Sequence, residues 1–288
     1  MYFASEPCST QAMTSQLLKK IGAQPELTWL AMMDGAFDHG KASISLVNER
    51  HALYDCDGMS DLLAASPFLI ALTAQDESRL RLELAALARH RKERPMLSFI
   101  STPSQANAVN ENFRLFANAV TEDGQEFLLR FADTRVLPGI PDALRQTYWD
   151  GMTGLLSEWI IIDRVGQLQS LPLNANRCPL QGSFQLSPVE FATLVTQGEP
   201  DAILDVIAET NPEALPGLDR AAIYEKVAGA CAFAHEHGVR AFPDLVALAY
   251  LALLNDGKGL KMPKLSEMLL RLEWSDGNLI NCLSDYVT

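Results

Sequence analysis

The chain lacks the cysteine pattern of a disulfide-stabilised or zinc-stabilised protein. Its five cysteines are scattered along the sequence without any CxxC pair, at Cys8, Cys56, Cys178, Cys231 and Cys282. A disulfide framework or a structural zinc site requires cysteines in regular, closely spaced sets. We therefore expect free thiols and a reducing, cytoplasmic environment.

Long apolar runs and an excess of positive charge are also missing. The longest apolar window, Leu245–Leu254, has about half the length that a membrane-spanning helix needs. The N-terminal stretch MYFASEPCSTQAMTSQ has no basic start followed by an apolar run, so no signal peptide is expected. A net charge of −13 disfavours nucleic acid and anionic membranes as partners, because both would repel the chain.

Catalytic motifs are equally scarce, since no GxSxG, P-loop, GxGxxG or HExxH pattern occurs. The sharpest candidate is LYDCDGMSD, in which Asp55 would be the nucleophile and Asp57 the second acid of a magnesium-dependent phosphatase. The preceding NERHA is too polar for the buried strand that such a site requires. A surface turn that caps a helix is the favoured interpretation, and the phosphatase remains the alternative.

Metal and phosphate sites find little support in the remaining polar residues. His235 and His237 are two positions apart, about 200° around a helix, and so cannot share one metal ion. We expect neither a metal nor a cofactor. The basic cluster between Arg79 and Arg94 is interleaved with acids and crowds the end of an expected helix. It favours a solvated helix face over a phosphate site.

The apolar pattern that is present predicts an α/β domain followed by a helical one. Short apolar runs with strand composition occupy residues 27–33, 68–72, 95–101, 126–131 and 158–163. Amphipathic helical patterns lie between them, at 76–92 and 104–120. This alternation predicts an α/β lobe over residues 1–173 whose central sheet is mixed or mostly parallel.

Beyond residue 173 the strand signals disappear. Residues 171–185 collect Pro, Asn and Gly without a period, which indicates a linker over 174–185, and residues 186–288 have the pattern of an all-α lobe. SPVE at Ser187–Glu190 is a capping box that starts a helix, expected to stop at Gly198. A second short helix is expected after Pro200, and further helices over 219–238, 243–255 and 263–286.

The stretch EFLLRFADTRVLPG concentrates charge in an apolar context. In a strand, Asp133 would lie on the same side as Arg135, whereas Arg130 would point to the other side. A half-buried arginine needs an acidic partner, because leaving it unpaired costs several kcal/mol. We predict Asp34, in MMDGAFD, as the remote partner of Arg130. Structural ion pairing is favoured, and contact with a ligand or partner protein is the alternative.

At these residues the sequence resembles a known family. LAMMDGAFD, ALYDC, ASPFLIAL, LSFIS and LLRFADTRVLPGI resemble, in this order, the adaptor/chaperone family of the bacterial type VI secretion system, first catalogued as a domain of unknown function. The resemblance covers residues 27–173. The family pattern Arg-Phe-Tyr-Asp-Pro-Arg is kept except that Ala132 and Thr134 replace the tyrosine and the proline. The matching residues are Asp34, Gly35, Ala36, Tyr54, Pro67, Phe68, Arg130, Phe131, Asp133 and Arg135.

The resemblance implies a non-catalytic bacterial cytoplasmic adaptor without a cofactor. Such a protein binds one cognate toxin effector, keeps it soluble and delivers it to the VgrG spike. The ten matching residues would then be structural or interaction residues, and the helical lobe at 186–288 would select the cargo. A structural component of the secretion machine remains the third alternative.

Overall fold

A computed structural model describes residues 2–38, 43–56, 58–178, 180, 183–215 and 219–283. The chain divides into two compact units. The α/β unit is Pro7–Val195, and the helical unit is Thr196–Thr288 together with Met1–Glu6. The expected α/β class with a helical C-terminal part is confirmed. The segments 1–173, 174–185 and 186–288 remain predictions, because compactness alone does not show which parts fold independently.

The α/β unit is built on a six-stranded sheet of order β2-β3-β1-β4-β7-β8. Every neighbouring pair in it is antiparallel, so the prediction of a mixed or mostly parallel central sheet is wrong. The reason is that β1 lies between β3 and β4 and runs opposite to both. The mixed sheet is a smaller one, in which β5 pairs antiparallel with β6 and parallel with β9. The strands are β1 (Thr28–Met33), β2 (Arg50–Ala52), β3 (Phe68–Ala71), β4 (Leu97–Thr102), β5 (Asn118–Thr121), β6 (Glu126–Leu128), β7 (Glu158–Ile162), β8 (Leu168–Ser170) and β9 (Gln185–Leu186).

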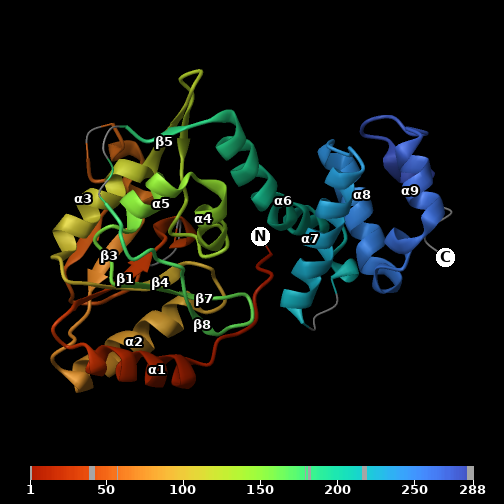
Figure 1. The fold of residues 1–288 in the computed structure, drawn as a ribbon. Coiled ribbons are helices and arrows are strands. Elements are labelled where there is room, and N and C mark those ends of the chain that lie inside the picture. The colour runs from red at the N-terminus through yellow and green to blue at the C-terminus, as the bar shows by residue number, and fades with distance from the viewer. Residues whose placement is uncertain are drawn as a thin grey trace. The chain divides into compact units, whose positions relative to one another are not determined.

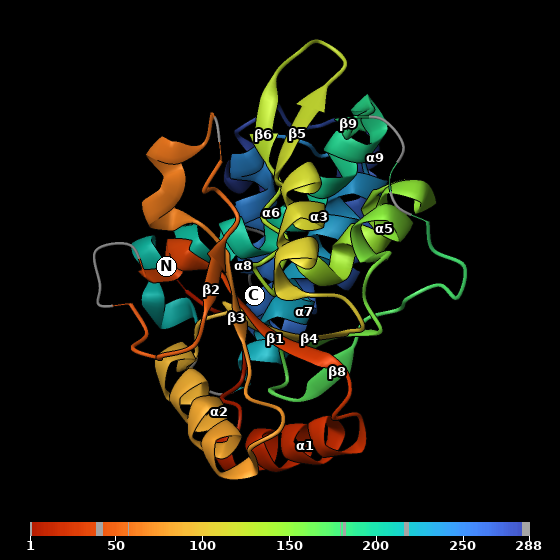
Figure 2. The ribbon, with the colours of Figure 1, turned by 90° about the vertical axis from the view of Figure 1, so that its left-hand side faces the viewer.

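Helices cover both faces of the six-stranded sheet (Figures 1 and 2). One face carries α1 (Thr10–Ala23) and α2 (Glu77–Arg91), and the other carries α3 (Ala106–Ala117) and α5 (Gln146–Thr153). A short helix, α4 (Ile140–Ala143), contributes Ile140 to the core cluster on the α3 side. Both helices predicted in this unit are present, and α2 begins where Asp76 accepts a hydrogen bond from the Arg79 backbone nitrogen.

One predicted strand is shorter than expected. β6 ends at Leu128 instead of continuing to Phe131. The last backbone hydrogen bond beside it runs from the Leu129 nitrogen to the Ala117 oxygen at 3.0 Å. The Asp133 nitrogen then donates to the Arg130 oxygen at 3.0 Å, which closes a turn. The charged stretch is therefore a turn and not a strand.

The helical part contains α6 (Pro188–Thr210), α7 (Arg220–Glu236), α8 (Phe242–Leu253) and α9 (Pro263–Leu270). The predicted capping box is confirmed, because the Ser187 nitrogen donates to Glu190 and the Glu190 nitrogen to Ser187 Oγ. The predicted stop at Gly198 is wrong, since α6 continues through Gly198 and Pro200. Proline removes only one helical hydrogen bond, and the buried stripe that follows it favours continuation: Ile203, Leu204 and Ile207.

Each unit has its own apolar cluster. In the α/β unit the largest cluster joins α3 to the sheet, for example through Phe113 and Trp159, whose ring centroids are 5.2 Å apart. In the helical unit the cluster joins α6, α7, α8 and α9. Within the described ranges, no helix is both long and apolar enough to cross a membrane.

Candidate functional site

The residues that carry the family resemblance gather at one end of the six-stranded sheet. Met33, the last residue of β1, lies opposite Phe68 on one side and Leu97 on the other. Ala52, the last residue of β2, also lies opposite Phe68. The antiparallel register therefore brings the end of β1, the end of β2 and the start of β3 to the same place. The turn after β6 joins them, because the Thr134 nitrogen donates to the Pro95 oxygen just before β4.

Asp34 and Arg130 form an ion pair across this end of the sheet. Arg130 Nη2 donates to Asp34 Oδ2 at 2.7 Å, although the two residues are 96 positions apart. The other carboxylate oxygen accepts from the Ala36 nitrogen at 3.0 Å. Burial raises the pKa of Asp34 above its usual range, and the positive charge of Arg130 opposes this shift. The predicted pairing is confirmed.

Asp133 is the second buried acid of the site. Its carboxylate accepts from the Arg135 backbone nitrogen at 3.0 Å, from Nε at 3.1 Å and from Nη2 at 2.8 Å. Asp133 thus pairs with Arg135, the residue that strand alternation would place on the same side. Arg130 Nη2 also lies 3.5 Å from Asp133, which strand alternation did not predict. The turn explains this contact, because it brings residues three apart onto one side.

The two arginines of the turn enclose an aromatic ring. Phe37 lies in a 3₁₀ helix, η1 (Gly35–Asp38), that directly follows Asp34. The guanidinium carbons of Arg130 and Arg135 lie 5.3 and 5.6 Å from its ring centroid, at cation–π distance. Only Arg130 is substantially exposed, at 38% of its side chain, against 8% for Arg135. Arg130 is therefore the cation of this group that a partner could reach.

A second ionic group holds the far end of η1. Asp38 accepts from Arg94 Nη1 at 2.6 Å and lies 2.8 Å from His90 Nε2. Arg94 Nη1 also donates to the Phe37 oxygen at 2.8 Å. The sequence-based interpretation of the basic cluster as a solvated face is wrong for Arg91 and Arg94, whose side chains are largely buried. The position of these arginines near a helix end does not indicate that η1 packs against them.

The remaining motif residues hold the connection between β2 and β3 against η1. A Cβ on Gly35 would lie 2.2 Å from the Ser66 oxygen, so only glycine fits. The Tyr54 nitrogen donates to Ser66 Oγ at 2.9 Å, and this hydroxyl donates to the Pro67 oxygen at 2.7 Å. Burial, assisted by the charge of Asp34, raises the pKa of Tyr54 to about 12, so the phenol stays protonated.

Phe131 anchors the charged turn in the apolar core. It is 1% exposed, and its ring centroid lies 5.3 Å from that of Phe113 and 6.5 Å from that of Trp159. Aromatic packing of Phe131 and the ion pairs of Asp34 and Asp133 thus both hold the turn in place. Such an arrangement positions backbone and leaves little conformational freedom to its side chains.

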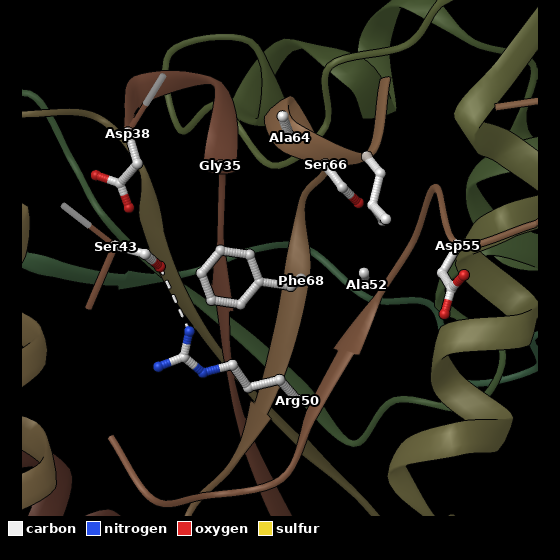
Figure 3. Close-up of a pocket in the computed structure, with 10 residues that line it drawn as sticks. Gly35, Asp38, Ser43, Arg50, Ala52, Asp55, Ala64, Ser66 and Phe68 are labelled. Atoms are coloured by element: carbon white, nitrogen blue, oxygen red, sulfur yellow. Dashed lines mark hydrogen bonds between the residues drawn. The ribbon is translucent and has the colours of Figure 1, made fainter. Parts of the chain in front are cut away.

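A pocket of about 610 Å³ opens beside these residues (Figure 3). It lies between η1, the edge strand β2 and a second 3₁₀ helix, η2 (Ser60–Ala65). The pocket was not expected from the sequence, because NERHA looked too polar for a strand and yet contains β2. The lining residues are Gly35, Asp38, Ser43, Arg50, Ala52, Asp55, Leu63, Ala64, Ser66 and Phe68.

The candidate phosphatase residues are only partly placed. Asp55 is exposed on the wall of this pocket, and its backbone oxygen accepts from Arg114 Nη2 at 2.7 Å. Asp57 lies outside the described residues. Throughout the described ranges, no three His, Cys, Asp or Glu side chains are grouped so that they could hold a metal ion. The chemistry that the motif residues themselves offer is ion pairing and hydrogen bonding.

Comparison with known families gives one match. Residues 29–150 match the model of a domain of unknown function, DUF4123. The matched range lies inside the α/β unit and contains all ten residues of the sequence resemblance. No curated protein and no solved structure matches the chain.

Proposed function

We propose that this chain, whose residues 29–150 match a family associated with type VI secretion effector adaptors, is such an adaptor. In this proposal it binds one cognate toxin effector in the bacterial cytoplasm and helps to load it onto the VgrG spike. The family match carries the proposal. The arrangement of the ten matching residues at one end of the sheet supports it.

The chemistry of the site supports a non-catalytic role. A general base or a nucleophile needs an oxygen that is free to take a proton or attack a substrate. Both motif carboxylates are instead occupied, Asp34 by Arg130 and the Ala36 nitrogen, and Asp133 by Arg135. Charges held in this way fix loops against one another, which is what a binding surface needs.

Co-expression with the product of the adjacent toxin gene tests the proposal. An adaptor should form a stable complex with that effector, detected by co-purification and light scattering. Deletion of the adaptor gene should abolish secretion of this toxin alone, measured by secretion assays on several effectors. Loss of all secretion would instead indicate a structural component of the machine, and absence of a complex would refute the adaptor role.

The division of labour between the two parts of the chain is a further element of the proposal. The family match ends at residue 150, so the helical part is free to differ between relatives and to select the cargo. In an exchange of residues 186–288 with those of a related adaptor, the junction lies before the capping box and α6, so neither is cut. We expect the exchange to transfer cargo specificity, and unchanged specificity would contradict this assignment.

A further inference from the structure

Arg50 is a pocket arginine whose hydrogen-bond partners are all neutral. Its guanidinium donates to Ser43 Oγ at 3.4 Å, to the Leu46 oxygen at 3.5 Å and to the Ile44 oxygen. It also lies 5.6 Å from the ring centroid of Phe68 (Figure 3). Whereas Arg130 and Arg145 each contact a carboxylate, Arg50 forms no ion pair with any residue in the described ranges. Its charge is thus available to a ligand.

Apolar groups line part of the pocket beside this charge. The ring of Phe68 lies beside the guanidinium, and Ala52 and Ala64 face the same space (Figure 3). At the rim, η2 has no buried side chain, and it exposes Leu62 at 39% and Leu63 at 46%. A single cation beside these apolar groups suits a ligand that presents one acidic group next to an apolar one.

The backbone beside the pocket can pair with an extended segment. β2 is the edge of its sheet. The Glu49 oxygen accepts from Ala71 and the Leu53 nitrogen donates to Pro67, so the backbone groups of Arg50 and Ala52 point away from β3. The Ala52 oxygen is occupied by Arg114 Nη2 at 3.0 Å, which leaves the outward groups of Arg50 and the Ala52 nitrogen. A peptide at this edge would be short and anchored by a side chain.

The charges around the pocket favour one acid and not several. Asp38 is already paired with Arg94 and His90, so it does not compete for Arg50. Asp55 lies across the pocket from Arg50 (Figure 3) and would repel a second acid. The net charge of −13 is screened beyond about 8–10 Å at physiological salt, so the local cation dominates inside the pocket.

We propose that this pocket binds an extended segment of the partner protein that presents one acidic side chain beside an apolar residue, with Arg50 as the residue that binds the acid. The inference rests on the proposed adaptor function, because it assigns a surface to the effector contact. It is independent of the motif ion pairs, which hold the pocket wall and do not enter the pocket.

The experiment measures binding of the full chain to the toxin encoded by the adjacent gene, by isothermal titration. Arg50→Glu should weaken binding by about 30-fold or more, because it places an acid against the acid of the effector. Arg50→Lys should weaken it by about three- to tenfold, because lysine lacks the bidentate fork. The matched control is Arg81→Glu, which reverses an arginine that is 56% exposed on α2, and it should bind like the wild type.

A second variant separates binding from folding. Because Arg50 also holds residues 43–46, Leu63→Asp changes the pocket rim without touching those hydrogen bonds. It should also weaken binding by about tenfold or more at an unchanged melting temperature. A charge-reversal pair tests the contact directly. If the acidic effector residue that binds Arg50 is replaced by arginine, this effector variant should bind the Arg50→Glu chain.

The outcomes distinguish the two proposals. If the wild type binds the effector and the folded Arg50 and Leu63 variants bind equally well, the pocket inference is overturned and the adaptor function stands. If the wild type does not bind the effector, both are overturned. Restored binding in the charge-reversed pair would establish the contact.

Discussion

In the α/β unit buried charges join segments that are distant in sequence, whereas the helical unit is held mainly by apolar side chains. Among the described residues, every buried polar or charged side chain except Ser5 and Asp244 lies between Pro7 and Val195. The Arg130–Asp34 and Arg94–Asp38 contacts span 96 and 56 positions. In the helical unit, the His235–Glu199 contact spans only 36 positions, and the Arg271–Glu267 pair spans four positions and is exposed.

The difference shows what each kind of contact is suited to. Helices that pack along apolar stripes tolerate exchange of side chains of similar volume, so their outer surface can change freely. Several loops that must meet at one point need directional contacts, and buried ion pairs provide both direction and a large penalty for misplacement. The family match falls on the unit that uses ion pairs.

Asp133→Ala should produce the largest loss of stability. It leaves Arg135, which is 8% exposed, without its carboxylate, and the expected cost is about 3–5 kcal/mol in the free energy of unfolding. The matched change in the helical unit, Glu267→Ala, removes an exposed pair and should cost about 0.5 kcal/mol or less. Urea denaturation measures both, and equal losses would remove the contrast between the units.

Arg130→Ala should have the next largest effect, about 2–4 kcal/mol, because it leaves the carboxylate of Asp34 buried without a cation. Burial already raises the pKa of Asp34, and loss of Arg130 raises it further. The native state then holds this proton more tightly than the unfolded state, so stability falls as pH rises through that pKa. The loss in free energy of unfolding of Arg130→Ala, relative to the wild type, should be larger at about pH 7 than at about pH 4.

Effector binding by the Arg130→Ala variant distinguishes a structural role of Arg130 from a direct contact with the effector. A scaffold role predicts that stability and binding fall together in Arg130→Ala. If the variant kept the wild-type melting temperature and still lost the effector, Arg130 would be a direct contact and the scaffold interpretation would be refuted.

Gly35→Ala tests the close approach between η1 and the β2–β3 connection. The added Cβ would lie 2.2 Å from the Ser66 oxygen, so the backbone must shift, at about 1–3 kcal/mol. Gly22→Ala is the matched control, because no atom lies within 4 Å of its added Cβ. This control should be neutral or stabilising by up to about 1 kcal/mol. Thermal unfolding of both variants measures the difference, and a tolerated Gly35→Ala would disprove the tight fit.

Glu190→Gln should have a smaller effect than the three changes above in the α/β unit, and one that depends on pH. Hydrogen bonds from Arg145 lower the pKa of Glu190 to about 2, so its contribution is present above its usual value of 4.5 and is lost as pH falls towards 2. Because Arg145 is 49% exposed, we expect only about 1 kcal/mol at neutral pH. Wild type and variant should converge in acid, and a constant difference across the pH range would contradict this assignment.

The sequence predicted the Asp34–Arg130 pair because of a simple requirement. An arginine in an apolar segment needs an acid, and Asp34 directly follows a strongly apolar strand. The helix starts at Asp76, Ser187 and Asp219 were predictable for a similar reason, since capping is local.

Other features depend on tertiary placement and could not be predicted. Arg94 looked like a helix-end cation, and only the packing of η1 makes it a partner of Asp38. β2 is a polar three-residue edge strand, so its sequence carries no strand period, and the pocket beside it has no local signature. In α6, burial of the residues after Pro200 outweighed the helix-breaking tendency of Gly198 and proline.

The span of the Asp34–Arg130 contact also bears on how the protein is made. At about 5–20 residues per second, a ribosome that has just added Asp34 needs roughly 5–20 s to add Arg130, 96 positions later. During that interval Asp34, which directly follows β1, exists without the cation that its carboxylate will bind. This end of the sheet therefore closes only after the turn at 129–137 has left the ribosome, and a stalled chain that stops before Arg130 exposes the apolar ends of β1 and β3.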